Sequence, residues 1–263
     1  MMAIEERQVE DLQGLLAEVL QIAEGAGGAF FWFRGVDCST HALLPKIARD
    51  GMVPDEIFER EARLLTRFRQ RSMAYWPSGY PQNDWEHLFA MQHYGMPTRL
   101  LDWSENLFVA AYFALASSPD HKHEGDCIPV IWCVDPVAWN RFKKKISEYG
   151  STIQVLTTAD DELEPYRPDT TRKRNKSPIA IFGAHNSQRI VAQRGTFFVW
   201  GNETKPLDEV ANDVMSTLWK IQLTGSRADL ARDLQRLGFG ETMVFPELSY
   251  LAAELTRTEG WKK

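Results

Sequence analysis

Residues 92–104 hold several chemically reactive side-chain types in one short stretch, Gln-His-Tyr-Gly-Met-Pro-Thr-Arg-Leu-Leu-Asp-Trp-Ser. A histidine can act as a general acid or base, and a carboxylate can orient a hydroxyl group or stabilise a cation. An arginine offers paired donors that match phosphate and carboxylate groups. Packing explains the two leucines but not this density of polar groups. The stretch therefore predicts a binding or catalytic site.

The neighbouring elements place these groups at the edge of a sheet. Residues 98–104 begin with alternating polar and apolar residues, as a short strand does, and residues 106–114 predict a helix of small residues. A strand that ends in Asp-Trp-Ser delivers its last side chains to the rim of a sheet, where sites tend to lie. Asp102 can orient a ligand hydroxyl, pair with an arginine or cap the helix, whereas Ser104 is expected to be a helix cap.

Other positions carry candidate chemistry with a structural alternative beside each. Arg34 and Gly35 end an aromatic strand, where the guanidinium can bind an anion and the glycine allows close approach. The alternative for Arg34 is a salt bridge. His93 precedes a Gly-Met-Pro turn and is a general acid or base, a ligand contact or a helix cap. Gln193 lies two residues before Gly195, which opens an aromatic strand. Its alternatives are an exposed turn and a cleft that faces the stretch 92–104.

The periodicity of the whole chain predicts an α+β fold, a single domain with mixed or antiparallel sheets and flanking helices. Helices are predicted over 5–24, 54–76, 84–94, 136–149, 226–237 and 247–256, and strands over 29–35, 98–104, 128–134, 180–182, 196–200, 215–223 and 238–245. Residues 157–177, acidic and then basic, are interpreted as a long loop. We divide the chain into an N-terminal helix (1–28), the domain (29–256) and a tail (257–263).

Composition narrows the function classes. The net charge of −6 gives no overall positive field for nucleic acid or an anionic membrane, and no apolar run is long enough to span a membrane. Cys38, Cys127 and Cys133 lack metal-site spacing and are expected to be free thiols in the cytoplasm. The histidines form no ligand cluster, and the P-loop, G-x-G-x-x-G, H-E-x-x-H and G-x-S-x-G motifs are absent from the sequence. We therefore expect no metal.

Several runs together resemble the FRG-domain family, which is named for the Phe-Arg-Gly found here at residues 33–35. The matching motifs are Phe33-Arg-Gly35, Leu64-Leu-x-Arg-Phe68, Gln92 to Ser104, Ala111-Tyr-Phe-Ala114, Ala192-Gln-x-Gly195-x-Phe and Phe245-Pro-Glu-Leu. The resemblance spans roughly residues 29–256, and its most specific part is the His-Tyr-Gly-x-Pro-Thr-Arg-Leu-Leu-Asp-Trp core.

A more distant resemblance is to ADP-ribosyltransferases of the arginine-serine-glutamate type. In those enzymes an aromatic strand ends in Arg-Gly, a later strand ends in Ser-x-Ser before an Ala-x-x-Phe-Ala helix, and a glutamate opens a further strand. The resemblance implies a split sheet that binds NAD. The catalytic residues that it implies are Arg34, Asp102 and Gln193. The NAD-binding residues that it implies are Arg34, Gly35, His93, Tyr94, Thr98, Arg99 and Trp103.

The sequence departs from that pattern at Gln193, which stands where the glutamate is expected. That glutamate stabilises positive charge on the ribose as nicotinamide leaves, and a neutral amide cannot fully replace it. Either Gln193 is not the equivalent position, or Asp102 or Glu241 has this role, or the reaction is not a transfer.

Three functional hypotheses follow. The leading one is an NAD-dependent ADP-ribosyltransferase-like toxin or anti-phage defence effector that modifies RNA or protein and has an antitoxin partner. The arginine-rich helix 60–71 and the basic run 172–176 are candidate RNA contacts, although such clusters are usually solvated faces. The alternative is a non-catalytic nucleotide-sensing or interaction module that uses the same cleft. The third is a hydrolase or nuclease with Asp102 and His93 as its acid and base.

Overall fold

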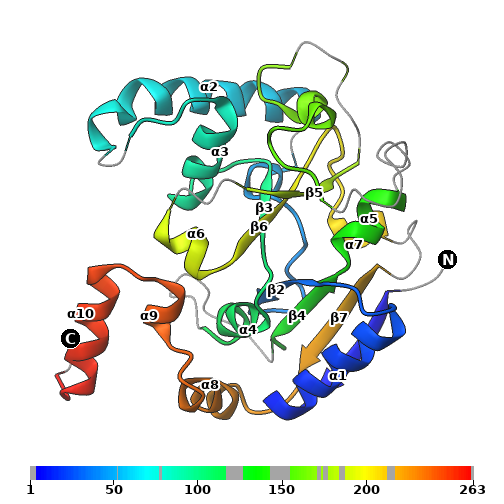
Figure 1. Cartoon of the computed structure of the whole chain (residues 1–263), viewed down its shortest axis with the longest axis vertical. Helices are drawn as coiled ribbons and strands as arrows, with labels where there is room; N and C mark the ends of the chain where they lie inside the picture. Colours follow the sequence, from blue (N-terminus) through cyan, green and yellow to red (C-terminus); the bar gives the residue numbers. More distant parts are fainter. Residues whose placement is uncertain are drawn as a thin grey trace.

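The computed structural model contains one mixed sheet of seven strands with helices packed on both of its faces (Figure 1). The structure describes residues 4–51, 53–76, 79–116, 127–142, 155–170, 173, 177–183, 187–211 and 217–261. Residues 121–126 and most of the basic run 172–176 lie outside the described residues. The architecture confirms the predicted α+β class.

The sheet has the strand order β1-β7-β4-β2-β3-β6-β5, and every neighbouring pair is antiparallel except β1 and β7. The strands are β1 (Glu5–Val9), β2 (Trp32–Val36), β3 (Leu100–Ser104), β4 (Val130–Val134), β5 (Ile179–Phe182), β6 (Gly195–Val199) and β7 (Leu218–Leu223). The predicted strands that correspond to β2 to β7 are confirmed, with slightly shifted bounds.

The helices described are mostly those that the periodicity predicts. They are α1 (Leu12–Gly25), α2 (Pro54–Ser72), α3 (Asp84–His93), α4 (Leu107–Leu115), α5 (Pro136–Phe142), α6 (Gln188–Ala192), α7 (Leu207–Ala211), α8 (Arg227–Arg236), α9 (Glu241–Val244) and α10 (Leu248–Thr258). Short 3-10 helices are η1 (Lys46–Ala48), η2 (Met73–Tyr75) and η4 (Asp161–Tyr166). The last of these lies in the predicted long loop.

Two stretches were assigned to the wrong kind of element. The helix expected from residue 5 begins only at Leu12, after the edge strand β1, which pairs with β7 over its whole length. The N-terminal segment is therefore part of the sheet. The last predicted strand, 238–245, contains the helix α9 instead. Both stretches are too short for periodicity to separate strand from helix, and tertiary packing decides between them.

The sheet consists of two halves that meet at a single point. β2 pairs with β4 over five residues, and β3 pairs with β6 over five, but between β2 and β3 only Phe33 and Ser104 are paired. Helices α1, α4 and α8 pack on the half that contains β2, and α3 packs on the half that contains β3 (Figure 1). Strands β2 and β3 therefore separate immediately after Phe33. The gap between them lies between helices α4 and α3.

Gly35 allows α4 to lie directly on β2. A Cβ atom at this position would lie 1.8 Å from the carbonyl oxygen of Ala110 and 2.7 Å from the amide nitrogen of Ala114. Both atoms belong to backbone, so a side chain at residue 35 would push the helix away from the strand. The small residues of α4 that the sequence shows serve this close contact.

Arg99 is the central residue of a buried ion pair. It is bound by Glu61 of α2, whose carboxylate accepts from the Arg99 backbone amide at 3.1 Å and from Nε at 2.7 Å. Its two terminal nitrogens donate to the carbonyl oxygens of Trp200 and Tyr166, at 2.5 and 2.8 Å. Both charged side chains are only 1% exposed. This network joins α2, β3, the end of β6 and η4.

Cys38 and Cys127 form a disulfide, so the expectation of three free thiols is wrong. β2 and β4 pair with Val36 opposite Val130, which brings the residues after β2 beside those before β4. The two Cα atoms are 5.0 Å apart, within the usual range. The cysteines are separated by 89 positions, so no local spacing reveals the pair. The pairing removes the argument for a reducing compartment. Cys133 is free and buried.

Glu61→Gln is expected to destabilise the protein strongly. The substitution keeps the shape of the side chain but leaves the Arg99 charge buried without a counterion, which costs ~3–5 kcal/mol of unfolding free energy. Urea unfolding measures this loss. The matched control is Glu59→Gln on the same helix, because Glu59 is exposed and its pair with Arg63 is worth at most ~1 kcal/mol. Equal effects of the two substitutions would contradict the structural role of the pair.

Gly35→Ala is expected to destabilise the fold by ~1–3 kcal/mol or more, because the added methyl group overlaps the backbone of α4. Gly25→Ala, at the last residue of α1 with open space around it, is the control and should be neutral or slightly stabilising. Thermal unfolding of both variants tests the difference. Unchanged stability in Gly35→Ala would show that the glycine is not required for packing.

Candidate functional site

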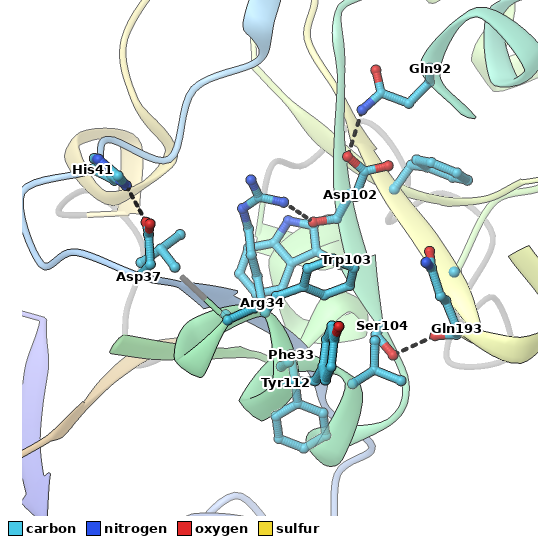
Figure 2. A pocket seen from close by; sticks show the side chains of 18 of the residues that line it. Phe33, Arg34, Asp37, His41, Gln92, Asp102, Trp103, Ser104, Tyr112 and Gln193 are labelled. Carbon is cyan, nitrogen blue, oxygen red and sulfur yellow. Dashed lines mark hydrogen bonds and ion pairs between the residues drawn. The ribbon is translucent and has the colours of Figure 1, made fainter. Parts of the chain in front are cut away.

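A cavity of about 840 Å³ occupies the place where β2 and β3 separate (Figure 2). Successive residues of a strand point to opposite faces of a sheet. Phe33 and Gly35 line the cavity from one face, whereas Arg34 and Val36 line it from the other. The cavity therefore reaches both faces of the sheet through the gap between its two halves.

Arg34 bridges this gap. Its Nη1 donates to the backbone carbonyl oxygen of Asp102 at 2.6 Å, across the position where a β2–β3 ladder would otherwise continue (Figure 2). Its buried Nε has no hydrogen-bond partner among the described residues. Burial of the guanidinium lowers the pKa of Arg34 to about 10, despite the opposing charge of Asp102. Arg34 is still protonated at neutral pH, so it presents an incompletely solvated positive charge to the cavity.

The side chain of Asp102 is held in place from α3. Gln92 donates from Nε2 to Oδ2 of Asp102 at 2.6 Å (Figure 2). The side-chain oxygen Oε1 of Gln92 accepts from the hydroxyl of Thr98 at 2.5 Å. Thr98 is completely buried, which fixes the beginning of this chain of hydrogen bonds. The carboxylate of Asp102 remains exposed towards the cavity. A carboxylate oriented in this way can stabilise positive charge or accept a proton.

The turn at Gln193 closes the cavity beside the end of β3. The hydroxyl of Ser104 donates to the carbonyl oxygen of Gln193 at 2.6 Å, and the Gln193 amide group donates to the carbonyl oxygen of Val244 at 3.1 Å. Gln193 thus lines the cavity while it ties α9 to the turn. The expectation that Ser104 caps α4 is wrong, because Asn106 has that role. Arg194 in this turn adopts a positive φ of 45°.

His93 and Arg189 face the cavity near the C-terminal segment. Burial lowers the pKa of His93 below its usual value of 6.5, and the positive charge of Arg189 lowers it further. The Arg189 guanidinium lies over the ring of Phe245, 4.4 Å from its centroid. Phe245 stacks on Tyr250 of α10. The C-terminal segment therefore contributes an aromatic wall to a site whose other walls come from β2, β3 and α3.

The structure gathers most of the predicted site residues at the cavity and places three elsewhere. Arg34, Gly35, His93, Asp102, Trp103 and Gln193 line it. Arg99 does not, because its donors all serve the buried network with Glu61. Thr98 does not line the cavity and reaches it only through its hydrogen bond to Gln92. Tyr94 lies outside the cavity, and its side chain is 67% exposed.

Sequence reasoning missed several residues of the cavity wall. Gln92, Arg49, Tyr112, Arg189 and the paired Asp37 and His41 all line it, with His41 Nδ1 2.9 Å from the Asp37 carboxylate. Gln92 and Tyr112 stand within the conspicuous motifs, and Gln92 directly precedes the candidate His93, so these motifs were the signal that could have found them. The others come from irregular segments or a short helix, and no local pattern marks them.

Within the described ranges, no group of three or more His, Cys, Asp or Glu side chains is arranged to hold a metal ion. In the same part of the chain, none of the helices has the length and apolar character that crossing a membrane requires.

His93→Gln is expected to reduce the loss of stability on acidification. Because the folded state lowers the pKa of His93, the unfolded chain binds more protons between the folded pKa and 6.5. Stability is therefore fully present above 6.5 and falls as the pH decreases through this window. Urea unfolding at about pH 7 and about pH 5.5 should show a smaller decrease in the variant than in the wild type. His87, whose pKa burial also lowers, maintains part of the dependence. Identical decreases would contradict the assignment.

Comparison with known proteins agrees with the motifs described above. Residues 29–123 match the family model of the FRG domain, and this segment includes β2, Glu61 and Arg99 of the buried ion pair, β3 and α4. No curated protein and no solved structure matched the chain. The extension of the domain to residue 256 stays a prediction. Residues 29–123 are therefore similar to the FRG domain, and this segment supplies Arg34, Gln92 and Asp102 to the cavity.

Proposed function

We propose that the cavity binds NAD and that the protein transfers the ADP-ribosyl group of NAD to a macromolecule. One observation carries this proposal: the half-buried guanidinium of Arg34, whose buried Nε has no partner among the described residues, lies in the gap of a split sheet beside the oriented carboxylate of Asp102. A cation that protein groups stabilise so incompletely gains most from an anionic ligand. A phosphate-containing substrate supplies that anion.

The charge distribution of the cavity supports an anionic ligand. Arg34, Arg49 and Arg189 line it, against the carboxylates of Asp37 and Asp102. The whole chain carries a net charge of −6, so this positive balance is local. Low-dielectric walls strengthen the attraction of such a pocket for anions.

Aromatic and donor groups in the same cavity suit the other parts of a dinucleotide. The rings of Trp103, Tyr112, Phe113 and Phe197 are apolar surfaces for a base or a nicotinamide ring. The buried indole Nε1 of Trp103 has no hydrogen-bond partner among the described residues. A carbonyl or hydroxyl group of a ligand would satisfy this donor.

In the proposed reaction, the bond between the nicotinamide nitrogen and C1′ of the ribose breaks, and nicotinamide leaves with the electron pair. The acceptor then bonds to C1′ and releases a proton. Arg34 holds the phosphate part of the substrate. Asp102 supplies the negative charge that stabilises the positive charge developing on the ribose, and Gln92 keeps its carboxylate in position.

A second candidate is a sensor module that binds the nucleotide without turning it over. The observation that favours it is the lining of the cavity, where the described residues include two aspartates but no glutamate. The first proposal, an ADP-ribosyltransferase, includes a biological role. The enzyme would act as a toxin or anti-phage effector and would have an antitoxin partner. The acceptor is RNA or protein.

The test is incubation of the purified protein with NAD labelled in its adenylate part and a total cell lysate, followed by separation of protein and RNA. We expect label in one fraction. Arg34→Ala should abolish labelling, and Asp102→Asn should lower the rate ~10²–10³-fold, because it removes one electrostatic contact to the reacting centre. Asp102→Asn keeps an acceptor for the Gln92 amide, so binding of NAD should change little.

Arg236→Ala is the control, because Arg236 is exposed on α8 and outside the cavity. It should label at the wild-type rate. Each variant is compared with the wild type by thermal unfolding. Binding of NAD without label or nicotinamide release would identify the sensor. Absence of both binding and turnover would disprove the NAD proposal.

A further inference from the structure

Arg49 is a second cation on the wall of the cavity, and the proposed catalytic steps do not use it. It follows η1 and lines the same cavity as Arg34. Its Nε donates to the carbonyl oxygen of Leu44 at 3.2 Å, which folds the side chain back along its own segment. Within the described part of the chain, the terminal nitrogens of its guanidinium form no hydrogen bond or ion pair, so they are available to a ligand.

The segment that carries Arg49 is firmly anchored. Ile47 and Ala48 are buried against Ile57 of α2. Lys46 donates from Nζ to the carbonyl oxygen of Gly95, in the turn that follows α3. Arg49 is therefore presented from a fixed backbone, although its side chain is exposed. A site built on such a backbone loses less entropy on binding than one on a free loop.

Arg34 and Arg49 share the cavity without a carboxylate partner. Each has a hydrogen bond to a backbone carbonyl oxygen, from Asp102 and Leu44, and neither forms an ion pair with a described Asp or Glu. The positive charge of Arg49 contributes to the lowered pKa of Arg34, after the effect of burial, so the two groups repel each other.

We propose that Arg34 and Arg49 together bind the diphosphate of the ligand, one phosphate for each guanidinium. The inference rests on the proposed function and assigns the phosphate-recognition residues of that site. A diphosphate carries charge on both phosphates and offers separate oxygen atoms to two planar donor forks. Such a ligand converts the repulsion between the arginines into two attractions. The pair selects dinucleotides and nucleoside diphosphates over monophosphates.

Isothermal titration calorimetry with ADP-ribose, ADP, AMP and inorganic pyrophosphate tests this assignment. We expect the first two to bind more tightly than AMP. Arg49→Ala should weaken ADP-ribose and ADP ~10- to 100-fold and AMP much less, so that the preference disappears; a charged hydrogen bond has about this worth. Arg49→Lys keeps the charge without the planar fork and should recover part of the affinity. Arg236→Ala should bind as the wild type does.

The outcomes separate this inference from the proposed function. ADP-ribose binding that is unchanged in Arg49→Ala overturns the inference, even if NAD turns over. Diphosphate binding that depends on Arg34 and Arg49 in a protein without NAD turnover supports the inference and disproves the transferase. Equal losses for AMP and ADP in Arg49→Ala overturn the pairing of one arginine with each phosphate. Absence of binding by all four compounds overturns the site itself.

Discussion

The buried pair of Glu61 and Arg99 is the constraint on which the site geometry depends. A buried arginine is tolerable only if most of its donors are satisfied, and here Glu61 and the carbonyl oxygens of Trp200 and Tyr166 satisfy them. Four segments distant in sequence must therefore meet at one point. That point is the residue before β3, so the network determines where the strand begins. Asp102, three residues later, consequently reaches the gap in the sheet.

The second constraint is the incomplete pairing of β2 and β3. Two strands that separate after one residue pair expose backbone groups, and buried backbone groups need partners. Arg34 supplies one partner by donating to the Asp102 carbonyl oxygen, and thereby keeps the gap open instead of allowing it to close as a ladder. The same side chain is then structural and available to a ligand. This dual role explains why the aromatic strand β2 carries a charged residue at its centre.

The sequence predicts the fold and part of the site because those features are local. Arg34 and Asp102 each come at the end of a strand with clear periodicity, and both reach the cavity. Arg99 was assigned to the ligand because its partner Glu61 lies 38 residues earlier, on the apolar face of another helix. The spacing of Ile57, Glu61 and Leu65 marks that acid as buried, but nothing local indicates which cation it meets. The disulfide depends in the same way on the β2–β4 register.

The pairing of β1 with β7 has a consequence for how the chain folds. Glu5 lies opposite Trp219, so the first strand completes the sheet edge only after the last strand is available. Contacts of such large sequence separation are typical of slow folding. During synthesis the first strand leaves the ribosome long before its partner, with its hydrogen-bonding edge unsatisfied. A nascent chain therefore exposes an unpaired first strand while the residues between β1 and β7 are synthesised.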